Sequence, residues 1–410
     1  MPIRSVPLDQ VTEADVLALK DRGVREDQTL DYKRELDVAS DKGKFELLKD
    51  VSALANTTGG VIVYGVTEGE GDDAGRIVDL PGLALEIDKT QNTIDQLLHD
   101  GIDERIPGIR HRAIQRKDGK HYLVIRVPPS HLAPHMVRYN FPSVRFYQRG
   151  TTTNQPMNAQ QIKETALRAA TAVDRARATV TERIRVAQQR AAARKSIQGM
   201  VSKKEGPDQA LLHVTPLFGP IDALDLTGPI VDRLKAIPVF GYSDRIADHR
   251  LALEGLYREI GSGADVLAYN LFLRNGAIEF QEYDILLRAA PEEGGKLWFR
   301  ARLLEDDVIE TITHVRSLTE AGILPLPALV SLTLLEVQGS ILNPGWPRTR
   351  MFSPQPASDS SIVAIDPILI TDWSDDPARS MKRLFDIMWQ AWGWPSSGSY
   401  DNDGNRKPIA

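Results

Sequence analysis

The segment from Asn56 to Glu68 constrains the fold of this chain more than any other. It reads Asn-Thr-Thr-Gly-Gly-Val-Ile-Val-Tyr-Gly-Val-Thr-Glu and follows a stretch with the apolar spacing of a helix. The polar residues and the two glycines predict a helix end and a tight turn, because glycine readily adopts the left-handed conformation that ends helices. The apolar run that starts at Gly60 predicts a strand buried on both faces. The chain therefore passes from a helix through a turn into a central strand, and Glu68 follows where that strand ends.

Composition limits the kind of protein that this chain can be. Its 410 residues are 42% hydrophobic and 26% charged, which is typical of a globular protein with two or three domains. No run of about 18 apolar residues is present, so we expect no membrane span. The absence of cysteine excludes disulfides, thiolate catalysis and cysteine zinc sites. Because the N-terminus is also unlike a signal peptide, we expect a cytoplasmic protein.

Charge is distributed unevenly along the sequence. Residues 1–204 contain 32 Lys and Arg against 27 Asp and Glu, whereas residues 205–410 contain 18 against 29, within a net charge of −6. A basic half is compatible with nucleic-acid binding even though the whole chain is acidic. The two halves are therefore expected to have different roles.

Residues 1–157 predict one compact α/β domain, because helical and strand patterns alternate along them. Asp118-Gly119 separates two strand patterns and predicts a hairpin. The expected helices are 12–22, 44–56 and 87–98, and the expected strands are 28–36, 60–66, 109–114, 121–127 and 144–149.

Residues 158–204 predict a single long helix that is rich in Ala, Gln and Arg. From Lys163 to Lys204 it contains 11 basic residues and three acids. One interpretation is a solvated connector that packs on its own domain or on a second copy of the chain. The other is a basic edge that steers a phosphate backbone, and both can hold.

Residues 205–394 predict a second domain of the α+β class, in which no catalytic constellation is recognisable. We expect that it senses a signal or mediates assembly. Its expected strands are 210–217, 265–273, 277–287, 328–337 and 362–370, the last interrupted by Pro367, and its expected helices are 297–321 and 378–392. The Ser-, Gly-, Asn- and Asp-rich residues 395–410 predict a disordered tail.

Three acids and a lysine in the first domain form the candidate site. Alternate residues of a strand share a face, so Asp31 and Lys33 are expected to lie together. Glu26 comes just before that strand, and Glu68 follows the buried strand, where sites of α/β sheets collect. Mg²⁺ and Mn²⁺ prefer carboxylate oxygens, so we predict that Glu26, Asp31 and Glu68 bind Mg²⁺ or Mn²⁺. Lys33 would neutralise a scissile phosphate.

Each of these features has a simpler explanation when it is taken alone. An Asp-x-Lys pair on a strand is usually an exposed ion pair of little consequence. The turn after Asn56 is commonly only a helix cap, and the acids that follow Glu68 would ordinarily form a solvated loop.

Together, however, these residues resemble the AlbA-type domain of the Schlafen family. The resemblance rests on Glu-x₄-Asp-Tyr-Lys from Glu26, on the segment from Ser52 to Gly60, and on Gly65-Val66-Thr67-Glu68. Looser matches, such as Tyr147-Gln148-Arg149-Gly150, extend it over about residues 10–165. It implies a metal-dependent endoribonuclease that acts on structured RNA, with tRNA as the leading substrate.

The same resemblance implies which residues act and how the protein assembles. Glu26, Asp31 and Glu68 match the three acids of the family, although the second is commonly Glu and the third commonly Asp there. Relatives pair two such lobes around RNA, which suggests a homodimer. Antiviral defence or a regulated toxin is the biological role that we expect.

The alternative function is a non-catalytic DNA- or RNA-binding transcriptional regulator. The presence of all three acids with Lys33 favours catalysis, because acids beside a phosphate weaken simple binding. For either function, the expected nucleic-acid contacts are Arg34, Arg145, Arg149, Arg175, Arg183 and Arg190.

Two further activities are less favoured by the sequence. ATP hydrolysis by a P-loop is not expected, because no Gly-x₄-Gly-Lys-Ser/Thr motif is present. Metal-free RNA cleavage by a pair of histidines is conceivable, and the candidates are His111, His121, His131 and His135.

Overall fold

A computed structural model describes most of the chain, which divides into two compact units. The described residues are 3, 8, 11–139, 145–201, 208–219, 224, 226, 230–261, 266–288, 297–321, 323–343, 357–373 and 375–408. The first unit is Met1–Val173 with Leu318–Pro327, and the second is Asp174–Ser317 with Ala328–Ala410. Within the described parts, none of the helices combines the length and apolarity that crossing a bilayer requires.

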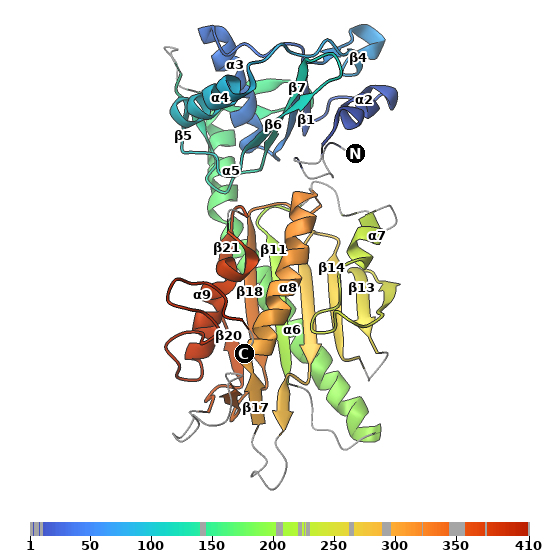
Figure 1. The fold of residues 1–410 in the computed structure, drawn as a ribbon, viewed down its shortest axis with the longest axis vertical. Helices are drawn as coiled ribbons and strands as arrows, with labels where there is room; N and C mark the ends of the chain where they lie inside the picture. Colours follow the sequence, from blue (N-terminus) through green and yellow to red (C-terminus); the bar gives the residue numbers. More distant parts are fainter. Residues whose placement is uncertain are drawn as a thin grey trace. The chain divides into compact units, whose positions relative to one another are not determined.

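The first unit is built around a four-stranded sheet in the order β1-β2-β7-β6 (Figure 1). Strands β1 and β2 are parallel, and the other pairs are antiparallel. A smaller antiparallel sheet has the order β10-β9-β8-β5, and β3 pairs with β4. The elements are α2 Glu13–Asp21, β1 Leu30–Lys33, α3 Asp41–Ala55, β2 Gly60–Tyr64, β3 Thr67–Glu68, β4 Ile77–Asp79, α4 Ile87–Gly101, β5 Ile102–Asp103, β6 Arg110–Gln115, β7 His121–Val127, β8 Met136–Val137, β9 Arg145–Arg149, β10 Asn154–Pro156 and α5 Ala159–Ala170.

Strand β2 is buried on both faces, as its apolar run predicted. Ile62 and Tyr64 pack in the core that contains the apolar side of α3, whereas Val61 and Val63 pack in the core on the α2 side. Alternate residues of one strand thus supply two hydrophobic cores.

The double-glycine turn connects α3 to β2 in a space that admits no side chain. Gly59 has a φ of +70°, and its N–H donates to the Leu54 carbonyl at 2.9 Å. A Cβ atom on Gly59 would lie 2.6 Å from the Val127 carbonyl oxygen, and one on Gly60 would lie 2.5 Å from the Thr29 oxygen. The two glycines therefore allow β2 to lie directly against its neighbours.

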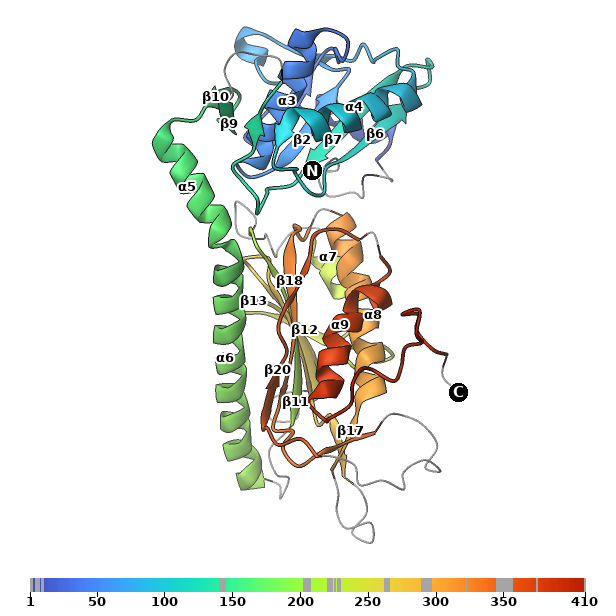
Figure 2. The ribbon, with the colours of Figure 1, turned by 90° about the vertical axis from the view of Figure 1, so that its left-hand side faces the viewer.

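The second unit has three layers, with α6 on one face of a large sheet and α8 and α9 on the other (Figure 2). The sheet has the order β12-β13-β14-β15-β11-β18-β20, with β21 also paired to β18, and β16-β17-β19 form a smaller sheet. The elements are α6 Ala172–Val201, β11 Gln209–Pro216, α7 Ile230–Lys235, β12 Asp248–Leu251, β13 Gly255–Ile260, β14 Ala268–Leu273, β15 Ile278–Tyr283, β16 Leu286–Arg288, β17 Leu297–Arg300, α8 Ala301–Glu320, β18 Ala328–Leu335, β19 Ile341–Asn343, β20 Ile362–Ala364, β21 Ile368–Ile370 and α9 Pro377–Gln390.

The structure confirms the mixed α/β and α+β class and corrects three details of the organisation. The helix expected over residues 158–204 is two helices, α5 and α6, which are separated at Thr171; residues 202–204 lie outside the described residues. Leu297–Arg300, expected to be helical, forms β17, because it pairs with β16 and with the distant β19.

The third correction concerns the tail, since residues 395–408 are ordered by contacts rather than disordered. The Ser397 hydroxyl donates to the buried Glu305 carboxylate at 2.7 Å, and Arg406 forms an ion pair with the same group. The indole of Trp389 also donates to Glu305 at 2.7 Å. A buried carboxylate requires such partners, and the polar tail supplies two of them.

Two arginines of α6 bind acids on the sheet of the second unit. Arg183 forms two hydrogen bonds with Glu279, at 2.6 and 2.9 Å, and Arg190 donates to Glu254 at 2.6 Å. Burial alone would raise the pKa of the fully buried Glu279, but hydrogen bonds from His213 and Arg183 lower it well below its usual value. These ion pairs hold α6 on the sheet.

We therefore expect Glu279→Gln to lower the free energy of unfolding of the second unit by about 3–5 kcal/mol, because it leaves buried cationic charge uncompensated. Urea denaturation followed by tryptophan fluorescence isolates this unit, since all six tryptophans lie between residues 298 and 394. Glu182→Gln is the control, because Glu182 pairs with Arg185 on the exposed side of the same helix and should change little.

The effect of Glu279→Gln should also depend on pH. A carboxylate with a lowered pKa stabilises the fold above its unfolded value of 4.5 and loses that contribution as the pH falls through the folded value. The difference between the two proteins should therefore shrink below pH 4.5. Equal stability at neutral pH would show that this ion pair does not hold α6.

Candidate functional site

Asp31 and Lys33 lie on the same side of β1, as the two-residue period of a strand requires. The Asp31 side chain is 1% exposed and that of Lys33 is 34% exposed, and Lys33 Nζ lies 2.9 Å from Asp31 Oδ2. The pair therefore has a buried anion and a cation that reaches solvent.

A second cation, Arg149, neutralises Asp31 from the other side. It ends β9, and its Nη2 lies 3.1 Å from Asp31 Oδ1 and 3.3 Å from the Leu30 carbonyl oxygen. The Arg149 side chain is 1% exposed. Arg149, which was expected to contact nucleic acid, therefore has its guanidinium buried inside the unit and paired with Asp31.

Asp50, on the buried face of α3, is a member of the site that sequence reasoning missed. Its Oδ2 lies 3.7 Å from Lys33 Nζ, and its Oδ1 accepts a hydrogen bond from Asn154 at 2.5 Å. Burial raises the pKa of Asp50 to about 6, although Lys33 opposes the shift. The available signal was an acid within the apolar sequence Leu47-Leu48-Lys49-Asp50-Val51, because a charge on a buried helix face needs a partner.

The two carboxylates keep Lys33 charged. Burial alone would lower the pKa of the Lys33 ammonium, but Asp50 and Asp31 raise it above the usual value of 10.5. Lys33 is therefore a fixed cation with one side open to solvent.

Glu26 lies beside this cluster and holds a proton at neutral pH. Burial is the main cause that raises its pKa to about 8, against a hydrogen bond from the Tyr32 N–H, and contact with Asp31 adds to the rise. The charge of Glu68 raises it further. Glu68 itself lies at the end of β3 and is exposed. The structure thus brings together Glu26, Asp31 and Lys33, with Glu68 near enough to influence Glu26.

Asn56 fixes the position of the strand that carries Arg149. It caps the C-terminus of α3, is 1% exposed, and donates to the carbonyls of His135 and Tyr147 at 2.9 Å each. The His135 N–H donates back to Asn56 Oδ1 at 2.6 Å. The adjacent Thr57 hydroxyl accepts the N–H of Arg149 at 3.0 Å. The polar end of α3 therefore sets the register of β8 and β9 and places Arg149 over β1.

The three predicted metal ligands do not fit a metal ion in this arrangement. Among the described residues, no group of three or more Asp, Glu and His side chains is placed to hold one. Asp31 shows why, since Arg149 and Lys33 already bind its oxygens. A Mg²⁺ or Mn²⁺ ion at about 2.0–2.6 Å would have to displace one of these cations.

Some of the other predicted arginines are exposed, whereas others form ion pairs within the protein. Arg34 and Arg145 in the first unit are exposed, as is Arg175 in the second. Arg183 and Arg190, which were also expected to contact nucleic acid, bind Glu279 and Glu254 on the side of α6 that faces the sheet.

Two of the candidate histidines, His111 and His121, do not lie opposite each other on the hairpin. His111 lies 2.7 Å from Asp95, and its strand register places it opposite Ile125 rather than His121. His135 contacts the Glu104 carbonyl oxygen at 2.8 Å, and burial lowers its pKa to about 4.

Comparison with known families identifies the domain that holds this site. Residues 26–158 match the family described as Schlafen, AlbA_2. The first unit therefore carries a Schlafen AlbA_2-type domain, as the sequence resemblance predicted. The match begins at Glu26 and includes Asp31, Lys33 and Glu68.

Several solved structures are similar to part of the chain. One of them is the N-terminal domain of a "putative ATP-dependent DNA helicase RecG-related protein" from Nitrosomonas europaea, with 23% identity over 36% of this chain and 93% of that one, at a TM-score of 0.26. A similarity of this size carries no argument about function. No curated protein matches the chain.

We expect Asn56→Ala to destabilise the first unit by about 2–4 kcal/mol, because three buried hydrogen bonds are lost and their partners stay buried. Hydrogen exchange of peptides from β8 and β9, read by mass spectrometry, would report the loss locally. Thr58→Val is the matched control: within the described residues its buried hydroxyl has no hydrogen-bond partner, so protection should be unchanged. Equal protection in the Asn56 variant would show that this cap does not hold the strands.

Proposed function

We propose that the first unit acts on the phosphodiester backbone of nucleic acid as an endoribonuclease. Structured RNA is the proposed substrate, with tRNA as the leading candidate. The observation that carries the proposal is the group of Glu26, Asp31 and Lys33, with Glu68 beside it, inside a Schlafen AlbA_2-type domain. A permanently charged lysine, open on one side to solvent and surrounded by acids, suits a phosphate whose charge grows during cleavage.

The roles of the residues follow from their exposure and contacts. Lys33 would bind the scissile phosphate, while Asp31 and Asp50 hold its ammonium in place. Glu68, which is exposed, would lie against the substrate and act as a catalytic acid or base. Glu26 carries a proton at neutral pH and would hold it close to Asp31. Arg34 and Arg145 are the exposed arginines of the same unit that would contact the RNA backbone.

No step of this proposal passes through a metal ion, because the acids do not fit one as arranged. Dependence on Mg²⁺ or Mn²⁺ would require Lys33 or Arg149 to release Asp31. The cleavage assay below includes each ion and a chelator, and therefore decides this point together with the activity.

A non-catalytic nucleic-acid-binding regulator is the second candidate. It is favoured by the charge balance at Asp31, which two cations already neutralise. In that function the acids would only stabilise the fold, and a variant that lacks one of them would show no change in any cleavage activity.

We expect Glu68→Gln to lower the cleavage of purified tRNA by about 100-fold or more, the usual size of the loss of a catalytic acid or base. The same variant should bind tRNA as tightly as the parent or slightly more tightly, since an acid beside a phosphate opposes binding. Cleavage is measured on denaturing gels with Mg²⁺, Mn²⁺ or EDTA, and binding is measured separately by gel shift.

Glu70→Gln is the matched control, because Glu70 is another exposed acid, two residues after Glu68. Its cleavage should equal that of the parent. Binding of tRNA without cleavage under any condition would favour the regulator, and a Glu68 variant with full activity would remove Glu68 from the site.

We also propose that the protein acts as a homodimer, in which two first units supply the paired lobes that RNA binding requires. Light scattering coupled to size-exclusion chromatography tests the assembly. Antiviral defence, or a toxin under control, is the biological setting that we propose for such an activity.

A further inference from the structure

Strand β12 lies at one end of the large sheet in the second unit, and its outer edge is exposed. Among the described strands it pairs only with β13, and all four of its residues, Asp248–Leu251, are exposed. Apolar side chains gather at this edge: Leu251 is 54% exposed, and Ile246, two residues before the strand, is 99% exposed. An edge strand with exposed apolar side chains is a template for pairing with another strand.

The backbone of β12 has hydrogen-bonding groups that point away from the sheet. In the hairpin with β13, the Ala252 N–H donates to the Gly255 carbonyl at 2.8 Å, and the Gly255 N–H donates back at 3.3 Å. Residues that exchange such bonds alternate along an antiparallel pair. The N–H and C=O groups of Asp248 and Arg250 therefore face β13, whereas those of His249, between them, face outward. A strand placed along this edge can bond to the outward groups.

The charges of β12 are complementary when two copies of the strand lie antiparallel. Residues whose backbone groups face outward must oppose one another, and a two-fold axis through His249 meets that condition. This axis places Asp248 opposite Arg250 of the second copy, in the closer kind of cross-strand pair. Opposite charges in such pairs are stabilising. An axis through Arg250 would instead place two arginines against each other.

The two charged side chains differ in the contacts that they already have. Arg250 Nε lies 3.1 Å from Glu259 Oε1, and Arg250 Cζ lies 4.0 Å from the centre of the Tyr257 ring. The Arg250 side chain is nevertheless 52% exposed, so guanidinium N–H groups remain open to a second acid. Asp248 is exposed, and within the described residues its carboxylate forms no ion pair. Arg250 is therefore oriented by its neighbours, and Asp248 has no cationic partner of its own.

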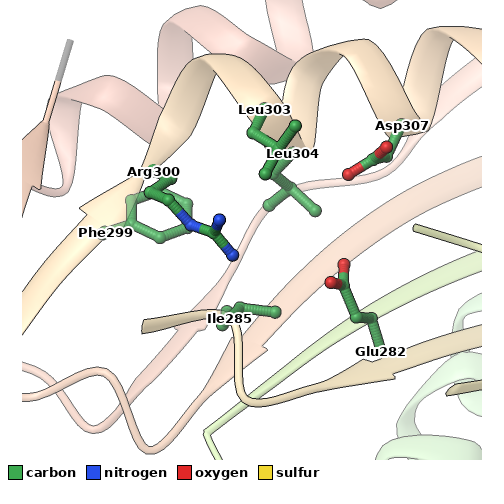
Figure 3. A pocket seen from close by; sticks show the side chains of 7 residues that line it. All are labelled: Glu282, Ile285, Phe299, Arg300, Leu303, Leu304 and Asp307. Atoms are coloured by element: carbon green, nitrogen blue, oxygen red, sulfur yellow. The ribbon is translucent and has the colours of Figure 1, made fainter. Parts of the chain in front are cut away.

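An internal gap of the same unit shows the opposite situation. Figure 3 shows the carboxyl groups of Glu282 and Asp307 turned toward each other, with the Arg300 guanidinium on the opposite side. The cavity has a volume of about 10 Å³, which is room for about one water molecule. The charge of Arg300 opposes the rise that burial causes in the pKa of both carboxyls. The charges at this gap act on one another and need no ligand, whereas Asp248 faces solvent.

We propose that β12 pairs with the β12 of a second copy of this chain, antiparallel and about a two-fold axis at His249. The large sheets of the two copies join into one across this axis, with about six backbone hydrogen bonds between them. Asp248 and Arg250 form an ion pair on each side of the axis. The homodimer proposed above thereby has its interface in the second unit, and the inference rests on that assembly rather than on RNA cleavage.

The same axis also covers the exposed apolar side chains. Ile246 lies opposite Ala252 of the second copy, and Leu251 lies opposite its Ala247. Each large side chain therefore meets a small one, so the two strands approach closely without steric conflict. Removal of apolar surface from water adds to the backbone hydrogen bonds and the ion pairs.

Exchange of charges across the axis tests both the pairing and its register. Asp248→Arg places arginine opposite arginine, and Arg250→Asp places acid opposite acid, so each variant alone should dimerise at least about tenfold more weakly. A mixture of the two variants should dimerise like the parent, because each acid then faces an arginine. The double variant should recover for the same reason. Dissociation constants of the full chain are measured by sedimentation velocity over a dilution series.

A backbone variant and a matched control complete the experiment. His249→Pro removes an outward N–H but none of the hydrogen bonds to β13, and proline is tolerated in an edge strand where its nitrogen faces solvent. It should dimerise at least about tenfold more weakly while its melting temperature stays near that of the parent. Asp366→Arg makes the same charge change at an exposed acid between β20 and β21, near the other end of the sheet, and should dimerise like the parent.

Three results would overturn the proposal. A parent chain that is monomeric at its highest soluble concentration would exclude the pairing and leave β12 to a strand of another protein. Undiminished dimers of His249→Pro, or of both charge variants, would show that the interface lies elsewhere. A mixture that does not recover would exclude the axis at His249. None of these measurements uses RNA, so failure of this interface is distinguishable from failure of the proposed cleavage.

Discussion

The neutralisation of the buried Asp31 carboxylate is the interaction on which the first unit depends. A carboxylate removed from water costs several kcal/mol unless cations reach it, and here they come from Lys33 on its own strand and Arg149 on β9. Arg149 is in place only when β9 is docked on α3, and hydrogen bonds of Asn56 and Thr57 dock it. The Asp31 charge therefore links β1 to the smaller sheet and to the end of α3.

Elements defined by local patterns were predictable from sequence. Helix α2 begins after Thr12 and ends before Gly23, and the hairpin of β6 and β7 surrounds Asp118-Gly119, as capping and turn chemistry required. The failures were non-local. Leu297–Arg300 is a strand because β19 lies beside it, more than 40 residues later, and the polar tail is ordered because Glu305 is buried beneath it. Neither partner can be read from the segment itself.

The candidate site shows the same division. The two-residue period of β1 correctly placed Asp31 with Lys33, and Glu26 lies beside them. Sequence reasoning treated arginines as free cations, however, and could not know that Arg149, Arg183 and Arg190 would meet buried acids. It also omitted Asp50, whose role depends on the packing of α3 against β1. Tertiary packing determines which residues from separate elements come together. A sequence pattern can therefore indicate a site, but it does not show which of its charges are paired.

That limit changes the meaning of the uneven charge along the sequence. The second half has 29 acids and 18 basic residues, a count that taken alone indicates a strongly negative surface. Several of those acids do not act as surface charges. Glu279 and Glu254 are paired with arginines of α6, and Glu282 and Asp307 retain protons near neutral pH because they are buried. Helix α6, which carries these arginines, was counted with the basic half of the sequence. Each half therefore has a smaller effective net charge than its count of charged residues indicates. Buried and paired charges contribute little field at a distance, so the formal count of acids overstates the negative potential around the second unit.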